Sequence, residues 1–266
     1  MRLTACGLYF IGVALCFTPA VQADTPQFQK TWAEFILKDF TYKEFADDGE
    51  LLDREDGILP GVGLGISWRW PDWYINGLAT IYYNQIRYDG QTQMGVPLET
   101  STDELIIDSE LSLAYLFPRG EGGEHRVYIG IGSRYWERDI KPGTDKNGNP
   151  VSGLFEIYEW PIGFLGGRWQ WGGDSKLDRS LDVRLFWPVG PNMSVDLLAD
   201  DPKLDLGANM GVRVGFPMDF RYRNKTYRIE PFVEQYEFDR SPVVLGVFEP
   251  RSKTRNLGVK FKFDWD

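Results

Sequence analysis

The sequence predicts an all-β fold, a single antiparallel up-and-down barrel of about ten strands that spans a membrane. Three observations lead to this prediction. Apolar or aromatic residues recur at every second position in about ten segments. The connections between these segments alternate between long and short. Beyond the first 23 residues, no apolar stretch reaches the roughly 20 residues that a membrane-spanning helix needs.

The composition excludes several classes of protein. Among 266 residues, 29 are Lys or Arg and 39 are Asp or Glu, which gives a formal net charge of -10. A surface of this charge does not attract nucleic acid, so no nucleic-acid partner is expected. Aromatic residues make up 15% of the chain and occur in short segments between acidic, Gly- and Pro-rich loops. This distribution argues against disorder and against a helical bundle.

The first 23 residues have the pattern of a secretory signal peptide. Arg2 precedes an apolar run, Pro19 interrupts it, and Val21-Gln22-Ala23 matches a small-x-small cleavage site. An uncleaved anchor helix is the alternative, but the apolar run is too short to cross a bilayer. We therefore expect cleavage near Ala23, which leaves residues 24–266 as the barrel domain.

Cysteine chemistry is not expected in the mature chain. The chain has 2 cysteines, Cys6 and Cys16, and both lie inside the expected signal peptide. Their removal excludes disulfides, thiolate metal sites and a cysteine nucleophile together.

The expected strands are segments of about ten residues or more, with ends defined to within about 2 to 4 residues. They span 31–45, 58–70, 73–87, 104–117, 125–137, 154–170, 177–188, 204–216, 225–238 and 255–265.

In the first half of the chain, the alternation strengthens after a weak start. The segment 31–45 is weakly patterned and is either a strand or partly a periplasmic arm, so eight and twelve strands are the alternative counts. From Val62 to Trp70 every second residue is apolar, and the residues between them are small or charged. The segment around Leu111 and Leu113 repeats this pattern, and its neighbours are assigned on the same period.

In the second half of the chain, the alternation is stronger. Val183 and Leu185 alternate with Asp182 and Arg184, and the segment that ends at Phe216 alternates in the same way. The last segment is the cleanest, because every second residue from Leu257 to Trp265 is apolar or aromatic. If each apolar face contacts lipid, the polar face of each strand lines the lumen.

The lengths of the connections are typical of a membrane barrel. Those near 46–57, 88–103, 138–153, 189–203 and 239–254 are long, and those at 71–72, 118–124, 171–176 and 217–224 are short. Outer-membrane barrels have short periplasmic turns and longer external loops. An even number of strands then leaves both termini in the periplasm.

Aromatic residues are expected to form a girdle at each membrane interface. The first group lies beside the short turns: Trp70, Trp73, Tyr74, Phe117, Phe216, Tyr227, Phe263 and Trp265. The second group lies beside the long loops: Tyr82, Tyr83, Tyr135, Trp136, Trp160 and Trp187. The alternative is that aromatic residues are simply good strand formers.

The C-terminal segment resembles the β-signal of Gram-negative outer-membrane β-barrel proteins. Asn256 is followed by Gly258 and then by the alternate aromatics Phe261 and Phe263. The chain departs from the usual pattern because Asp264-Trp265-Asp266 follows the last of these. The resemblance implies localisation in the cell outer membrane. It also implies an assembly-signal role for Asn256, Gly258, Phe261 and Phe263, recognised by the insertion machinery.

A catalytic centre is not expected. The omptin surface proteases are similar in size to this chain, but their site needs a His paired with Asp, and two further Asp, at the outer rim. His125 is the only histidine, and it follows the short connection 118–124, at the periplasmic end. A Ser-His dyad for acyl transfer lacks a base at the outer rim for the same reason.

Charged residues of both signs are expected to line the lumen. A barrel of this size has room inside only for side chains and a little water, so these charges should pair and fill it. The alternatives are a narrow path for ions or solutes, and acid–base catalysis by Glu230 and Glu234. The expected lumen residues are Asp108, Glu110, Arg134, Glu159, Asp182, Arg184, Arg213, Arg228, Glu230, Glu234, Lys260 and Lys262.

Two external loops are strongly acidic, yet no metal site and no cofactor are expected. The first loop contains Asp47, Asp48, Glu50, Asp53, Glu55 and Asp56, and the second contains Asp196, Asp200, Asp201 and Asp205. Such runs are usually solvated, although oxygen clusters also attract calcium. Residues 145–156 resemble an EF-hand loop only superficially, because Pro150 stands where glycine is required.

The glycines of Gly61-Val62-Gly63-Leu64-Gly65 are expected to make room on the lumen side or to allow sharp curvature. They do not form a nucleotide loop, since the third glycine spacing and a following helix are missing.

These observations favour a non-enzymatic outer-membrane barrel with a charge-filled lumen and a structural or surface-interaction role. A narrow channel and a surface hydrolase are the alternatives. The expected partners are outer-membrane lipid, lipopolysaccharide and the insertion machinery.

Overall fold

The computed structural model describes residues 27–92, 94–118, 124–174, 177–196, 201–222 and 225–265. The expected signal peptide and its cleavage site near Ala23 lie outside the described residues. Within these ranges, no helix has both the length and the apolar character needed to cross a membrane.

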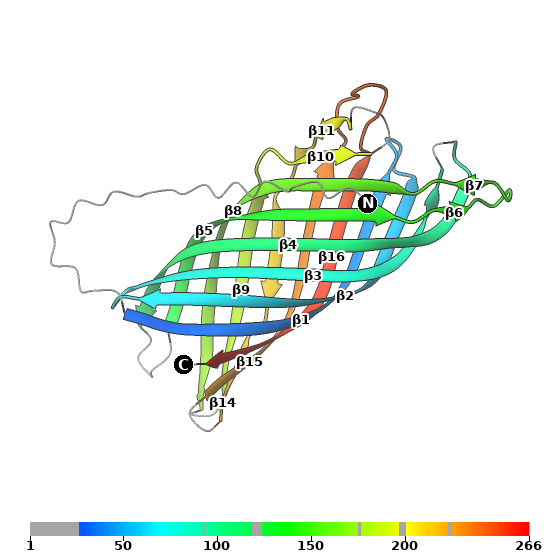
Figure 1. Cartoon of the computed structure of the whole chain (residues 1–266). Coiled ribbons are helices and arrows are strands. Elements are labelled where there is room, and N and C mark those ends of the chain that lie inside the picture. The colour runs from blue at the N-terminus through cyan, green and yellow to red at the C-terminus, as the bar shows by residue number, and fades with distance from the viewer. Residues whose placement is uncertain are drawn as a thin grey trace.

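The chain forms a closed antiparallel barrel in which each strand pairs with its neighbours in sequence and the first strand pairs with the last (Figure 1). The wall begins with β1 (Gln27–Phe45), β2 (Leu51–Arg69), β3 (Trp73–Gln91), β4 (Pro97–Pro118), β5 (Glu124–Ile140), β8 (Leu154–Asp174) and β9 (Leu177–Pro188). It ends with a broken eighth strand, β15 (Lys225–Asp239) and β16 (Arg251–Trp265).

The pairing of β1 with β16 closes the barrel and confirms the count of ten strands. Their register runs from Thr31 opposite Trp265 to Phe45 opposite Arg251. The weakly patterned first segment is therefore a full barrel strand, and a periplasmic arm in place of part of it is excluded for residues 31–45.

The eighth strand consists of β12 (Gly207–Ala208), β13 (Gly211–Gly215) and β14 (Met218–Tyr222). Both β13 and β14 lie between β9 and β15. Pro217 separates them, because proline has no backbone N–H to donate to a ladder. The expected short connection 217–224 is therefore wrong in its first part, which continues the strand.

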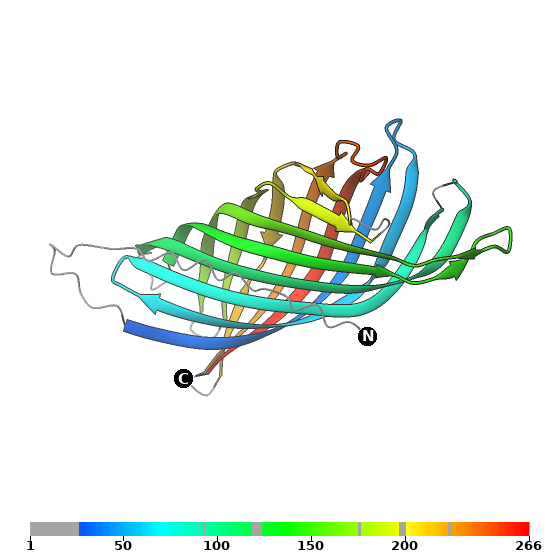
Figure 2. The same cartoon turned by 45° about the horizontal axis from the view of Figure 1, so that its top comes forward.

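Small hairpins extend the wall at the end that carries the long connections. β6 (Gly143–Thr144) pairs with β7 (Pro150–Val151), and β10 (Asn192–Val195) pairs with β8 and with β11 (Lys203–Asp205). Figure 2 shows the β6–β7 hairpin projecting beyond the barrel wall, in green, and the β10–β11 hairpin, in yellow, lying at the rim. The first residues of the expected strand 204–216 thus belong to the β10–β11 hairpin instead.

We call the end with these hairpins the long-connection end and the opposite end the turn end. The long connections are shorter than expected, because β2 already begins at Leu51, β3 continues to Gln91 and β5 continues to Ile140. The strands continue past the apolar outer belt, where the outward residues become polar. Leu37 is followed on the outer face by Asp39, and Tyr83 is followed by Gln85.

Outward residues of the belt form continuous apolar rows across the sheet. In one such row, Ile129 lies opposite Leu165, Leu165 opposite Leu185, and Leu185 opposite Val212. The side chains of Ile129 and Leu165 are exposed in the isolated chain. Belt residues thus present an apolar surface outward, as lipid contact requires.

The core of the protein lies inside the barrel. Ile36 and aromatic residues such as Phe40 and Trp136 are fully buried there. The glycine-rich segment of β2 contributes to this packing, because a Cβ at Gly65 would collide with the Trp32 indole and one at Gly61 would collide with the Tyr82 ring. The expectation that these glycines make room on the lumen side is confirmed.

Both expected girdles are partly wrong. In the first, Tyr74 lines the lumen cavity. In the second, Tyr83 and Trp187 are exposed on the outer face, but Tyr82, Trp136 and Trp160 are buried inside the barrel. Near the long-connection end the outer face is polar and the inner face is aromatic. Aromatic character alone therefore does not indicate which face a residue occupies there.

The two faces of β9 should tolerate charge very differently. Leu185→Arg places a cation on the lipid face, at a cost of about 2 to 4 kcal/mol near the bilayer midplane. Arg184→Gln changes a lumen residue that pairs with Glu110, so the barrel should still insert. The measurement is heat-modifiable gel mobility of the membrane fraction. Normal folding of Leu185→Arg together with failure of Arg184→Gln would invert the facing of β9.

Candidate functional site

The candidate site is the lumen, and eleven of the twelve expected lumen residues line its cavities. Glu159 is the exception and the prediction for it is wrong, because its side chain is exposed on the outer face. Its neighbours Tyr158 and Trp160 are buried inward. Beyond the apolar belt the outer face is in water, so the rule that apolar residues point outward no longer applies.

The turn-end half of the lumen contains a cavity of about 140 Å³ lined mainly by charged residues. Most of the charges are paired. Arg168 Nε lies 2.9 Å from an Asp182 carboxylate oxygen, and Arg184 Nη1 lies 2.7 Å from one of Glu110. The expectation that opposite charges pair in the lumen is confirmed in this half. Arg184 and Glu110 come from strands that are not neighbours, whereas Arg168 and Asp182 lie opposite each other on β8 and β9.

The middle of the lumen is nearly filled. A cavity of only about 20 Å³ remains there. Arg134 donates two hydrogen bonds to Asp108, at 2.6 and 2.9 Å, and lies 3.6 Å from Glu234. The Lys38 ammonium lies 3.8 Å from the centroid of the Tyr82 ring. Bidentate pairing and cation–π contact hold these cations in place.

The long-connection half contains a polar cluster around Arg138, whose side chain is 0% exposed. Its guanidinium donates to Glu156 at 2.6 Å, to both oxygens of Glu55 at 3.1 and 3.2 Å, and to Glu44 at 3.2 Å. We call this set the Arg138 plug; its members are Tyr42, Glu44, Glu55, Arg138, Glu156, Tyr158 and Glu249.

Tyrosines and a loop carboxyl complete the Arg138 plug. Tyr158 accepts a hydrogen bond from Arg138 at 2.9 Å. The hydroxyls of Tyr42 and Tyr158 donate to Glu249 at 2.8 and 2.7 Å. Glu249 comes from the connection between β15 and β16, and its backbone N–H donates to Ser241 Oγ at 2.8 Å. The plug therefore joins this loop to the wall strands.

An aromatic layer lies against the Arg138 plug. The Trp136 indole stacks on the Tyr158 ring at 4.8 Å, and Trp160 contacts Phe238 edge to face at 5.1 Å. The Trp136 Nε1–H donates to Glu104. Because these rings are large and rigid and Trp136 is completely buried, they pack the interior of the barrel at this level.

Glu249 belongs to the loop between β15 and β16 and not to a wall strand. Burial of its side chain raises its pKa well above the usual value of a glutamate. The neighbouring carboxylates of Glu44 and Glu156 raise this pKa further, while Arg138 opposes them. The neutral acid is therefore the form that the folded loop favours.

The expected lumen residues do not include Arg138, Glu55 or Glu156, although the two-residue period of β5 indicates that Arg138 faces the lumen. Arg126, Arg134 and Arg138 have the same parity in β5 and so face the same side of the sheet. Because Arg134 was expected to face the lumen, the same alternation along β5 predicts that Arg126 and Arg138 face it too. No comparable pattern identifies the acidic partners of Arg138. Asp53 and Glu55 are expected in a solvated loop, but both are buried in β2.

The acid–base alternative for Glu230 and Glu234 is not supported by the geometry. Glu230 lies 2.9 Å from Arg213, and Glu234 accepts a hydrogen bond from Asn256 at 3.1 Å and lies near Arg134. Both carboxylates are engaged by donors, as lumen filling requires.

The EF-hand-like segment is a hairpin tip, as expected. The Asp145 carboxylate accepts hydrogen bonds at 2.8 Å from the backbone N–H groups of Asn147 and Asn149. Hydrogen bonds from Asn149 lower the pKa of Asp145. Across the described part of the chain, no group of three or more His, Cys, Asp or Glu side chains is arranged to hold a metal.

The expected assembly-signal residues divide between the two faces of β16. Phe261 and Phe263 are 40% and 46% exposed on the outer face. Asn256 is buried and donates to Glu234, and Gly258 leaves room for the Phe232 ring. Packing explains Asn256 and Gly258 without a signal, and the assembly role of the four residues stays a prediction.

His125 lies at the turn end, near the start of β5, as expected. Its Nδ1 accepts a hydrogen bond from the Gln170 backbone N–H at 3.2 Å. This contact gives the imidazole a structural partner on β8, far along the wall from the Arg138 plug.

The raised pKa of Glu249 predicts a loop that loosens as the pH rises. A carboxyl whose pKa is raised on folding weakens the folded state above its unfolded value near 4.5, by up to about tenfold per pH unit. Glu249→Gln, which keeps the accepting oxygen but cannot ionise, should therefore protect the loop better at pH 8 and equally at pH 4. Hydrogen exchange of amides 241–252 measures this.

The control for this experiment is Glu99→Gln, which removes an exposed carboxylate at the same end. It should leave the exchange unchanged. Weaker protection of Glu249→Gln at pH 8 would contradict the account.

No protein-family model matches the chain, and no curated protein matches it in sequence. Among solved structures, the outer membrane protease OmpT from Escherichia coli is similar, with 8% identity, a TM-score of 0.54, and 92% of this chain and 99% of that chain covered. The translocator domain of autotransporter NalP from Neisseria meningitidis has 11% identity and a TM-score of 0.51, and 89% of this chain and 88% of that chain are covered.

These identities are low, so the likeness concerns the fold and not the activity. The two similar proteins differ in what their names describe, a protease and a translocator domain. Together with the closed ten-stranded barrel and its apolar outer belt, the likeness shows that this chain has the fold of the outer-membrane β-barrel proteins.

Proposed function

We propose that the chain is a non-enzymatic outer-membrane barrel whose lumen is closed at the extracellular side. In this proposal the long-connection end faces outward, the turn end faces the periplasm, and the role is structural or interaction with the surroundings of the cell. Lipid and lipopolysaccharide contact the belt, and the insertion machinery recognises β16.

The observation that carries the proposal is the Arg138 plug together with its aromatic layer. The guanidinium of Arg138 binds carboxylates from β1, β2 and β8, so it links the wall strands across the lumen. Such a buried network is costly to break, because removing one member leaves the others unpaired. A path for ions would have to interrupt it.

The long-connection end supports a surface role because it is acidic and exposed. Asp47 and Asp48 lie in the first connection, and Asp196 and Asp205 lie at the β10–β11 hairpin; all four are exposed. Carboxylates at an outer surface can attract the divalent cations that lipopolysaccharide carries. This part of the proposal concerns the kind of surface and names no receptor.

The alternatives receive less support from the geometry. A narrow channel is favoured only by the cavity of about 140 Å³, which occupies one half of the lumen. A surface hydrolase would need a base at the outer rim, whereas the single histidine lies at the turn end.

The closed lumen can be tested by conductance. The purified chain in planar bilayers should give no reproducible single-channel steps. The double variant Trp136→Ala with Tyr158→Ala removes two stacked rings from the closure and should produce steps. A control, Trp187→Ala, removes an exposed ring from the outer face and should stay silent.

Heat-modifiable gel mobility would show that each variant is folded. Regular steps from the unmodified chain would overturn the closed-lumen proposal and favour the channel.

A further inference from the structure

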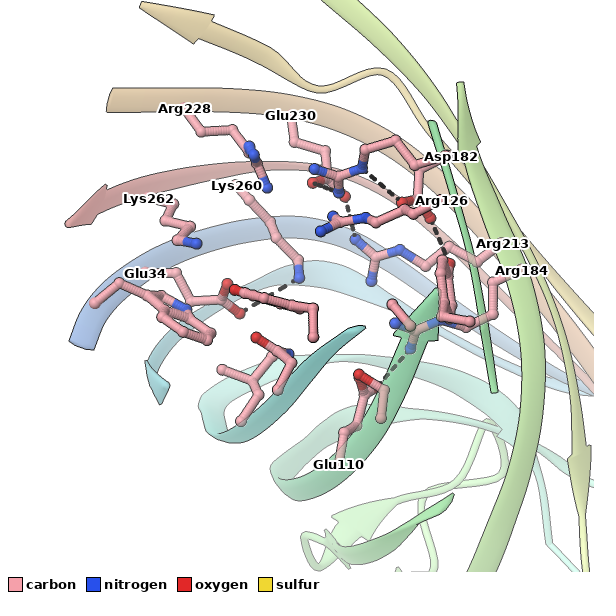
Figure 3. A pocket seen from close by; sticks show the side chains of 18 residues that line it. Glu34, Glu110, Arg126, Asp182, Arg184, Arg213, Arg228, Glu230, Lys260 and Lys262 are labelled. Carbon is pink, nitrogen blue, oxygen red and sulfur yellow. Dashed lines mark hydrogen bonds and ion pairs between the residues drawn. The ribbon is translucent and has the colours of Figure 1, made fainter. Parts of the chain in front are cut away.

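The cavity in the turn-end half of the lumen has an excess of positive charge that the closed-barrel proposal does not explain. Seven cationic and four acidic side chains line it, in a protein whose net charge is -10. Figure 3 shows Arg126, Arg228, Lys260 and Lys262 pointing toward one common space.

The four lining carboxylates are already occupied by four of the cations. Glu34 lies 3.4 Å from Lys260, Glu110 lies 2.7 Å from Arg184, and Asp182 lies 2.9 Å from Arg168. Glu230 lies 2.9 Å from Arg213. None of these carboxylates is left over for the remaining cations of the cavity.

Two of the remaining cations are bound by carboxylates at the mouth of the barrel. Arg228 donates two hydrogen bonds to Asp219, at 2.6 and 2.8 Å, and Lys262 Nζ lies 3.4 Å from Asp264. Arg126 is therefore the exception among the lining cations.

Arg126 forms no ion pair with any of the described carboxylates. Its Nε is buried without a hydrogen-bond partner, and its guanidinium lies 5.9 Å from the Tyr74 ring centroid. Its electrostatic neighbours are the like charges of Arg168 and Arg228 and the opposite charge of Asp182, whose carboxylate already pairs with Arg168. A partly buried guanidinium whose Nε has no partner, and which lies beside two like charges, is unfavourable unless an anion compensates it.

The size and the chemistry of the cavity fit a small oxyanion. Since one water occupies about 30 Å³ in the liquid, a volume of about 140 Å³ accommodates roughly five waters, or one small anion with a few waters of its hydration shell. Guanidinium groups bind phosphate and carboxylate oxygens through two parallel hydrogen bonds, and several cations around one space favour an anion of more than one charge.

Access is from the turn end. A further cavity of about 20 Å³, lined by Asp219, Thr226, Arg228, Lys262 and Asp264, shares Arg228 and Lys262 with the larger one. In the other direction, the middle of the lumen leaves a cavity of only about 20 Å³, and the Arg138 plug lies beyond it.

We propose that this cavity is a binding site for a small oxyanion of the phosphate class, which enters from the turn end and is held by Arg126 together with Arg228 and Lys262. The proposal goes beyond a closed structural barrel, since such a barrel needs no ligand. Free phosphate and a phosphate monoester present the same dianionic group, so both are candidates for the occupant.

The test is isothermal titration calorimetry on the folded full chain in detergent, in a chloride background of constant ionic strength. One arm uses inorganic phosphate and the second uses glycerol 3-phosphate, which distinguishes a free anion from an esterified headgroup. We expect saturable binding in at least one arm. Arg126→Gln should weaken that binding at least tenfold.

The matched control is Arg221→Gln, which removes the same charge from an exposed position at the turn end. It should bind as the unmodified chain does. Arg126→Lys keeps the charge but loses the two-pronged donor, and should bind at least threefold more weakly; it replaces Arg126→Gln if that variant does not fold.

Absence of saturable binding in both arms would overturn the proposal. Equal affinity of the unmodified chain and the folded Arg126 variant would also overturn it, because the unpaired guanidinium carries the argument. Neither outcome bears on conductance, so this proposal and the closed-lumen proposal can fail separately.

Discussion

The structure depends on one buried guanidinium. Arg138 is completely enclosed, and its donors engage carboxylates on strands that lie on different sides of the lumen. Burying a charge is unfavourable unless its partners surround it, and loss of one partner of a buried pair typically costs about 3–5 kcal/mol. The contacts of Arg138 therefore join several wall strands at this level, and Tyr158, which accepts from Arg138, also donates to Glu249 and so links the loop to the wall.

The sequence allowed prediction of the barrel and of most lumen residues, because the two-residue period reports facing wherever one face meets lipid. Asp182 and Arg184 were placed correctly for this reason. The same rule failed for Glu159 and Trp160, which lie where both sides of the wall meet polar surroundings or packed aromatics. The Arg138 plug lies in this region. The carboxylates that bind Arg138 come from separate strands, so the sequence pattern does not bring them together.

The two halves of the lumen have opposite charge character. Carboxylates outnumber cations around Arg138, whereas cations outnumber carboxylates around the larger cavity. Ion pairs, most of them between neighbouring strands, satisfy most of these groups. Arg126 forms no ion pair with a described carboxylate, and its Nε has no hydrogen-bond partner. This difference in charge matches the two proposals, a closed long-connection end and an anion-binding turn end.

The most direct test of the closed lumen is the side from which the larger cavity can be reached. Ser112 lines this cavity, and both native cysteines lie in the first 23 residues, so Ser112→Cys in residues 24–266 provides a single thiol. In oriented proteoliposomes, a small membrane-impermeant thiol reagent should modify this cysteine from the turn end and not from the long-connection end. Modification at similar rates from both ends would contradict the closure by the Arg138 plug.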